Sequence, residues 1–173
     1  MTLSLPDDYV TLDLETTGVS WQRDTIIEFG AVRVRNRKPV ATFQQLVDPA
    51  RPVSAFITRL TGITPAMLAD EPTLDRALPE FLDWCGDDVL VGHNIAAFDM
   101  QFIRSSSMLL LHHDVPNPVL DTLKLSRQLF PGERRHRLAD LIVRFDIADV
   151  EEHRALSDAQ QTRLCLEWMR EHC

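Results

Sequence analysis

The sequence predicts a mixed α/β fold, in which a central sheet with antiparallel and then parallel strands is flanked by helices. The first part of the chain contains three β-rich runs joined by turns, which is the pattern of an antiparallel meander. The remainder alternates short apolar strands with helical runs, a pattern typical of strands connected through helices. At 173 residues, 45% of them hydrophobic, the chain is long enough for one domain with a sizeable core. We therefore expect a single domain over residues 1–173.

The meander is expected near the N-terminus. Residues 9–15 form an apolar run that ends at Thr16-Thr17-Gly18, as a buried strand does when a turn follows. A second strand is expected over residues 25–35, which are rich in Ile and Val, and a third over residues 40–47 after a turn.

Helical signals follow the meander. Thr64 before Pro65 is a helix N-cap with proline at the first helical position. The amphipathic run that Thr73 opens contains Pro79, which we expect to kink the helix or to move its start. The later elements are expected as strands at 89–92 and 119–121 and as helices at 96–111, 122–130, 138–145 and 155–173.

Composition limits the partners and the compartment. Eighteen basic and 26 acidic residues give a net charge of −8, so any contact with nucleic acid should be local. Bound cations would invert the field near a carboxylate site, so this charge does not exclude such contact. Residues Met1 to Tyr9 lack the features of a signal peptide, and no apolar run approaches the ~20 residues that span a membrane. We therefore expect no association with a membrane. The three cysteines are widely spaced, as is typical of a protein in the reducing cytoplasm, where we expect this chain to be.

Asp13 and Glu15 are the first candidate metal ligands. Side chains two apart on a strand project from the same face, so these carboxylates should lie side by side. Their repulsion and desolvation are relieved if a cation lies between them, and oxygen ligands favour Mg²⁺ or Mn²⁺. The alternative is a solvated pair at a strand edge, which the apolar neighbours Leu12 and Leu14 make less attractive.

Asp99 follows a strand and a turn, near the start of a predicted helix. Its alternative role is to cap that helix or to interact with its dipole. Helix starts that follow strands often line the ligand-binding edge of a sheet, so both roles can hold together.

His153 and Asp158 are five residues apart, at the beginning of the last predicted helix, so both can face one cleft. A histidine with a reference pKa near ~6.5 can take a proton from metal-bound water. The alternative is an exposed histidine among Glu151, Glu152 and Arg154.

Two basic clusters could contact a phosphate backbone. One surrounds His136 with Arg134, Arg135 and Arg137, and the other covers residues 33–38. Solvated surface is the alternative for both, and aromatic residues do not interleave with them.

Three stretches together resemble the DEDDh branch of the DEDD exonuclease superfamily, which includes the epsilon proofreading subunit of bacterial DNA polymerase III and ribonuclease T. Residues 13–18 (Asp-Leu-Glu-Thr-Thr-Gly) are similar to the first motif of this family, residues 93–99 to the second, and His153 with Asp158 to the third. Residues 60–64, 120–122 and 136–138 also look like family segments, and the resemblance covers residues 9–170.

The resemblance implies a ribonuclease H-like fold and two divalent cations, Mg²⁺ or Mn²⁺. It implies that Asp13, Glu15 and Asp158 hold the first cation. Asp13 would bridge to the second cation, which Asp99 would support through water, and His153 would be the general base. Such cations clamp the attacking and leaving oxygens of an in-line displacement.

The resemblance also implies contacts with the terminal nucleotide. The implied substrate-binding residues are Thr16, Thr17, Gly18, Leu60, Thr61, Ile63, Asn94 and Phe98. Thr61 stands where many family members have a histidine that would stack on a base, and the Asn94–Phe98 stretch is one residue longer than the commonest form.

The expected function is that of a metal-dependent 3′-to-5′ exonuclease that acts on single-stranded DNA or frayed 3′ ends and releases nucleoside 5′-monophosphates. One alternative is an exoribonuclease that trims RNA 3′ ends or short oligonucleotides. Another is a nucleic-acid-binding module of a DNA polymerase, with weak activity of its own, although all five catalytic positions are filled. A DNA polymerase or another repair protein is an expected partner.

Overall fold

The computed structural model describes residues 5–173, so the first four residues of the Met1–Tyr9 segment lie outside it. The described chain contains five strands and seven helices, and the strands form one sheet in the order β3-β2-β1-β4-β5. None of the helices within residues 5–173 combines the length and the apolar character needed to cross a membrane.

The sheet confirms the predicted change of strand direction. β1 (Tyr9–Thr16), β2 (Ile26–Arg35) and β3 (Lys38–Leu46) pair as an antiparallel meander. β4 (Leu90–Gly92) pairs parallel to β1, and β5 (Val119–Asp121) pairs parallel to β4. The carboxyl ends of β1, β4 and β5 therefore lie at the same edge of the sheet.

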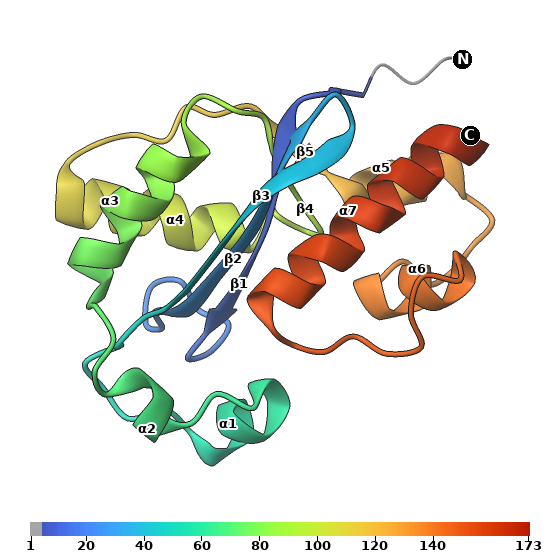
Figure 1. Ribbon diagram of the computed structural model, residues 1–173. Coiled ribbons are helices and arrows are strands. Elements are labelled where there is room, and N and C mark those ends of the chain that lie inside the picture. Colours follow the sequence, from blue (N-terminus) through green and yellow to red (C-terminus); the bar gives the residue numbers. More distant parts are fainter. Residues whose placement is uncertain (1–4) are drawn as a thin grey trace.

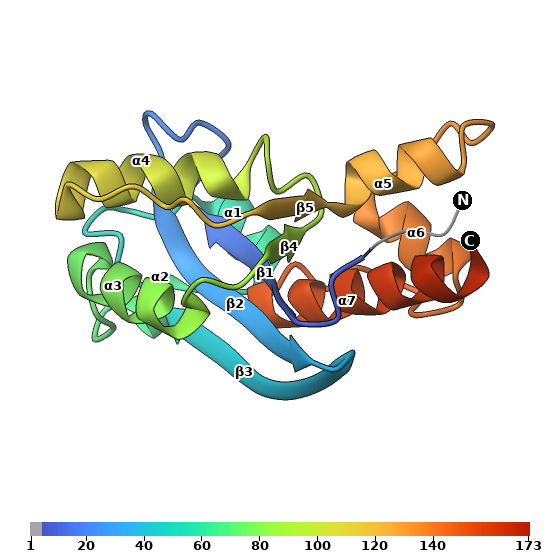
Figure 2. The ribbon, with the colours of Figure 1, turned by 90° about the horizontal axis from the view of Figure 1, so that it is seen from above.

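Helices cover both faces of this sheet (Figures 1 and 2). α3 and α4 lie on one face, and α7 lies on the other with α5 and α6 beside it. The helices are α1 (Ala55–Thr61), α2 (Pro65–Leu68), α3 (Leu74–Cys85), α4 (Asp99–Leu111), α5 (Thr122–Leu129), α6 (Leu138–Arg144) and α7 (Ala155–His172).

Three helical details differ from the expectations. α1 was not predicted, although Ser54 caps it by accepting a hydrogen bond from the Ile57 amide (3.2 Å). α4 begins at Asp99, three residues later than expected, because the chain first turns at Asn94, whose φ is +63°. Pro79 lies inside α3 and does not move its start.

β1 separates apolar from acidic side chains by its alternation. Val10, Leu12 and Leu14 are buried in the cluster that also contains α3 and α4. Asp13 and Glu15 consequently project from the opposite face, which α7 covers. The two β1 carboxylates thus lie on the side of the sheet where the last helix begins.

Gly30 lets α7 lie directly on the sheet. It pairs with Asp13 across β1 and β2, and a Cβ atom at Gly30 would lie 2.1 Å from the backbone of Ala155 and Leu156. Any side chain here would push the first turn of α7 away. This close approach brings Asp158, in the same turn, toward Asp13.

Glu28 fixes the same turn with a buried carboxylate. Its side chain is fully buried and accepts two hydrogen bonds from Arg154, at 2.7 and 3.1 Å. It also accepts hydrogen bonds from the Ala155 amide (3.1 Å) and from Gln44 (2.9 Å). A carboxylate with this many donors is satisfied without solvent, so β2 holds the start of α7 in one place.

We expect Glu28→Gln to weaken this anchor, because the neutral amide loses the ion pair with Arg154 and places an NH₂ group against donors. The free energy of unfolding, measured by urea denaturation followed by circular dichroism, should fall by about 3 kcal/mol, the low end for a buried ion pair that loses one partner. Glu171→Gln is the matched control, since Glu171 makes an exposed ion pair with Arg37. Equal stability of the two variants would show that Glu28 does not anchor α7.

Candidate active site

The acidic residues and the histidine singled out in the sequence meet where β1 and β4 end. Asp13 and Glu15 come from β1, Asp99 is the first residue of α4, and Asp158 lies in the first turn of α7. Asp13, Glu15, His153 and Asp158 line a cleft of about 220 Å³, here called the acidic cleft. Asp99 is not among the lining residues and has only 2% of its surface exposed.

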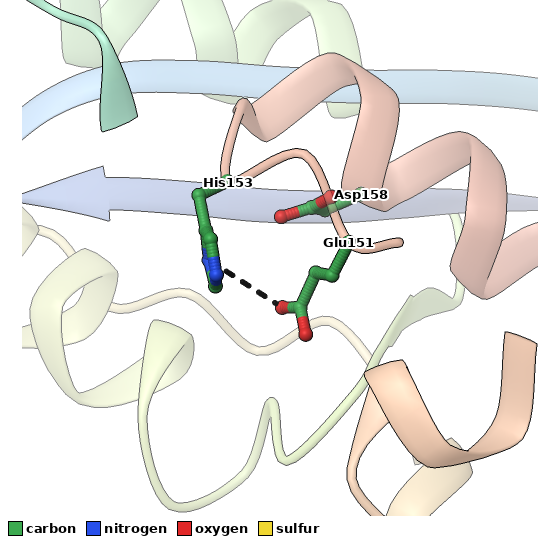
Figure 3. A group of neighbouring side chains, drawn as sticks. All are labelled: Glu151, His153 and Asp158. Atoms are coloured by element: carbon green, nitrogen blue, oxygen red, sulfur yellow. Dashed lines mark ion pairs between the residues drawn. The ribbon is translucent and has the colours of Figure 1, made fainter. Parts of the chain in front are cut away.

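Two groups of side chains have the spacing of metal ligands. Asp13, Glu15 and Asp158 each offer a carboxylate oxygen, and these atoms lie within 4.8 Å of one another. Glu151, His153 and Asp158 form a second group with the same spacing, shown in Figure 3. Asp158 belongs to both groups, so its carboxylate lies close to the β1 carboxylates and to His153 alike.

Burial and mutual repulsion raise the pKa values of these carboxyl groups. Burial, followed by repulsion from Asp99, Glu15 and Asp158, holds the pKa of Asp13 well above its usual range. Burial and then the Asp158 charge raise the pKa of Glu15 to about 9. Burial is also the main reason that the pKa of Asp99 and that of Asp158 rise to about 7. The cluster therefore resists carrying its full negative charge without a positive partner.

Two carboxylate oxygens support the same conclusion. Asp99 Oδ1 and Asp158 Oδ1 are buried and have no hydrogen-bond partner within residues 5–173. An unsatisfied buried oxygen costs free energy, and a hard cation is a suitable partner for it. The donor set, which consists almost entirely of carboxylate oxygens, fits Mg²⁺ or Mn²⁺ better than a thiolate-preferring metal.

Asp121 organises the loop that follows β4. Its Oδ1 accepts hydrogen bonds from the Asn94 amide (3.0 Å) and from the Leu123 amide (3.0 Å), so one carboxylate joins the β4–α4 loop to the start of α5. His93 is held nearby by a 3.0 Å hydrogen bond between its Nδ1 and Thr122 Oγ1. The sequence carried a signal for this role, because an aspartate between a strand and a helix is a common N-cap.

Glu151 is a site residue that the sequence analysis treated only as a neighbour of His153. Its Oε1 lies 3.8 Å from His153 Nδ1, and the two side chains point toward one another, with Asp158 nearby (Figure 3). Glu151 also lines the acidic cleft. His153 has a φ of +52°, which is uncommon for a residue other than glycine and is a form of strain found at functional sites.

The structure divides the implied substrate-binding residues into two groups. Thr16, Gly18, Leu60 and Phe98 line the acidic cleft, and Asn94 lines a neighbouring cleft that also contains Asp13. Thr17, in contrast, uses its hydroxyl inside the β1–β2 loop, where it bonds to Asp24 (3.2 Å) and to the Thr25 amide (3.1 Å).

Thr61 and Ile63 are buried rather than exposed to the cleft. Thr61 Oγ1 donates to the Ile57 carbonyl (3.0 Å) and accepts from the Ile63 amide (3.1 Å). These bonds hold the end of α1, from which exposed Phe56 and Leu60 reach the cleft. A contact of Thr17, Thr61 or Ile63 with a substrate stays a prediction.

The chain is similar to a part of PolC-type DNA polymerase III proteins. It is 45% identical over 159 residues to the DNA polymerase III PolC-type of Caldanaerobacter subterraneus subsp. tengcongensis and 44% identical over 161 residues to that of Bacillus subtilis. Each match covers 92% of this chain but 11% of the relative, so the chain spans about one ninth of the length of these proteins.

Solved structures of exonucleases share the fold. Exonuclease X, in a complex with 5′ overhanging duplex DNA, superposes with a TM-score of 0.76 at 28% identity and covers 95% of this chain and 92% of its own. E. coli exonuclease I with a dA16 oligonucleotide gives a TM-score of 0.83 at 16% identity, over 96% of this chain and 41% of that one. The ribonuclease H-like fold expected from the motifs is confirmed. Residues 10–164 match the model of the RNase_T exonuclease family, and the chain therefore belongs to that family.

Proposed function

We propose that this chain removes nucleotides from the 3′ ends of nucleic acids by hydrolysis, using two divalent cations, Mg²⁺ or Mn²⁺. The observation that carries the proposal is the convergence of Asp13, Glu15 and Asp158 within 4.8 Å in a cleft that His153 also lines. Membership of the exonuclease family supports the reaction class. The unpartnered oxygens of Asp99 and Asp158 support the requirement for cations.

The residues would divide the chemistry as follows. Asp13, Glu15 and Asp158 would hold one cation, and Asp13 with Asp99 would hold the other. When bound, the cations supply charge stabilisation for the attacking and leaving oxygens. His153 Nδ1 faces Glu151, which leaves Nε2 to accept the proton of the attacking water. Glu151 orients the imidazole ring, as a carboxylate beside a catalytic histidine does.

DNA is the substrate that the comparisons favour. The solved complexes of exonuclease X and of exonuclease I contain duplex DNA with a 5′ overhang and a dA16 oligonucleotide, respectively. We propose that single-stranded or frayed DNA 3′ ends occupy the acidic cleft, with Thr16, Gly18, Leu60 and Phe98 around the terminal nucleotide. The alternative is an RNA 3′ end, since no lining residue provides specific readout of a 2′-hydroxyl group.

The PolC-type relatives suggest the setting of the reaction. We propose that the chain acts beside a DNA polymerase, in proofreading or repair, in the cytoplasm. A polymerase-associated binding module with weak activity is the second candidate, and it would retain nucleic-acid binding with very slow hydrolysis.

Digestion of a 5′-labelled single-stranded DNA and of the matching RNA, each with Mn²⁺ and with EDTA, tests the reaction. The proposal expects a metal-dependent ladder that shortens from the 3′ end, with DNA degraded faster. Cleavage that continues in EDTA would contradict the role of the cations. Binding without cleavage of either strand would favour the binding module.

We expect substitutions in the acidic cleft to distinguish the metal ligands from the general base. Asp13→Asn or Asp158→Asn should lower kcat by more than about 10³-fold, because a lost metal ligand removes several kcal/mol of charge stabilisation. His153→Ala should lower kcat by about 10²- to 10⁴-fold near neutral pH, since only the general base is lost. His113→Ala, at an exposed histidine outside the site, is the control in the same initial-rate assay. Full activity of His153→Ala would refute the assignment of the base.

The raised pKa values predict how pH affects the metal-free protein. Glu15, Asp99 and Asp158 have folded-state pKa values of about 9, 7 and 7, above the ordinary values near ~4. At pH values between the unfolded-state and the folded-state pKa, the folded state binds more protons than the unfolded state. The free energy of unfolding must therefore fall as the pH rises through this range. In EDTA the Tm should therefore decrease from about pH 5 to about pH 9.

Mn²⁺ should restore the lost stability at alkaline pH, because it binds the ionised carboxylates of the folded chain. Asp158→Asn should flatten the pH dependence in EDTA and reduce the gain in Tm from Mn²⁺. Differential scanning fluorimetry measures both effects. An equal Tm in EDTA and in Mn²⁺ at alkaline pH would count against a cation site.

A further inference from the structure

A second and larger cleft opens beside the acidic cleft. It has a volume of about 660 Å³ and contains Asp13 and Glu151, which also line the acidic cleft. Its other lining residues include four arginines from α5 and from the connection to α6. We call it the arginine cleft after Arg127, Arg134, Arg135 and Arg137.

Three of these arginines have no acidic partner. Arg137 forms an ion pair with Asp140 at 3.0 Å, but Arg127, Arg134 and Arg135 make no ion pair with any residue from 5 to 173. All three are exposed. In a chain with 26 acidic and 18 basic residues, unpaired neighbouring guanidinium groups leave a local positive region against the negative total.

Hydrogen bonds hold the segment that carries Arg134, Arg135 and Arg137. His136 is buried, with Nδ1 2.7 Å from Ser126 Oγ and Nε2 3.0 Å from the Glu133 carbonyl oxygen. Arg144 donates a 2.8 Å hydrogen bond to the Arg135 carbonyl oxygen. The guanidinium groups are therefore presented from an ordered segment, which reduces the entropy lost when they bind an anion.

We propose that the arginine cleft binds the phosphate backbone of the nucleic-acid strand on the 5′ side of the nucleotide being removed. This inference depends on the proposed function. If the scissile phosphate lies at Asp13, the rest of the strand, on the 5′ side of that phosphate, must leave the acidic cleft. The arginine cleft is continuous with that position through Asp13 and Glu151. Guanidinium groups bind phosphate oxygens in a bidentate manner and do not depend on base identity.

The lining residues favour backbone contact over base contact. No Phe, Tyr or Trp side chain lines the arginine cleft in the described part of the chain. The rings of its two histidines, His93 and His136, are already hydrogen-bonded to Thr122 and Ser126. We consequently expect the arginine cleft to bind DNA and RNA strands alike, whatever their base sequence. The unpaired arginines also compensate locally for the net charge of −8, which would otherwise repel a polyanion.

Binding of a fluorescent oligonucleotide tests this inference without relying on cleavage. Fluorescence anisotropy would be measured in Mg²⁺ with Asp158→Asn as the common background, for a long single-stranded DNA, the matching RNA and a dinucleotide. The test variant adds Arg134→Ala and Arg135→Ala. The control variant adds Arg76→Ala and Arg104→Ala, exposed residues of α3 and of α4, and so has the same net charge.

The test variant should bind the long strand roughly tenfold more weakly than the background, while the control should stay within about twofold. The slope of log Kd against log salt should decrease by about 1.4, the value expected when two contacts with single-stranded phosphates are lost. The dinucleotide should lose much less affinity than the long strand. DNA and RNA should be affected equally if the backbone alone is bound.

Two results would overturn the proposal. If the test variant and the control bind the long strand equally well, the arginines do not contact it and instead suit an acidic protein surface. If the dinucleotide loses as much affinity as the long strand, the arginines act at the terminal nucleotide. Hydrolysis of the p-nitrophenyl ester of thymidine 5′-phosphate by the wild-type chain in Mn²⁺ tests the proposed function separately, because this substrate has no upstream phosphates.

Discussion

The contact between the first turn of α7 and the sheet is the constraint on which the site depends. Gly30 leaves no side chain between β2 and the backbone of Ala155, and buried Glu28 binds both Arg154 and the Ala155 amide. Together these features place Asp158 against Asp13 and Glu15, although some 140 residues of chain separate them. Moving this turn outward would leave the β1 carboxylates in place but would remove the residue that both ligand groups share.

The same contact creates an electrostatic cost. Four carboxyl groups are brought together where burial and mutual repulsion raise their pKa values. The hydrophobic cores on both faces of the sheet and the hydrogen bonds of buried Glu28 stabilise the folded chain against this repulsion. A site that is unfavourable without cations and favourable with them is prepared for metal binding, and such local destabilisation is typical of functional sites. The arginine cleft complements it, because phosphate groups bring negative charge that the carboxylates cannot balance.

Much of this arrangement could be predicted from local sequence signals. The alternation in β1 identified the face of Asp13 and Glu15, and the strand–turn–helix order placed Asp99 at the edge of the sheet. These features depend on neighbours in the sequence, so periodicity and capping residues were sufficient.

The remaining features depend on contacts between distant segments. Glu151 lines the site because of the path of the chain before α7, and no local pattern distinguishes it from Glu152. Because α1 was not predicted, Phe56 was not recognised as a residue that reaches the acidic cleft from that helix. The Arg134–Arg137 cluster was visible in the sequence, but only the fold shows that it shares a cleft with Asp13.

Counting the bound cations tests the central claim most directly. Titration of the metal-free chain with Mn²⁺, followed calorimetrically, should show two ions per wild-type chain. Asp158→Asn should lose at least one of them, because Asp158 is a proposed ligand of the cation that Asp13 and Glu15 also hold. Absence of Mn²⁺ binding by the folded wild-type chain, or unchanged binding in Asp158→Asn, would contradict the account.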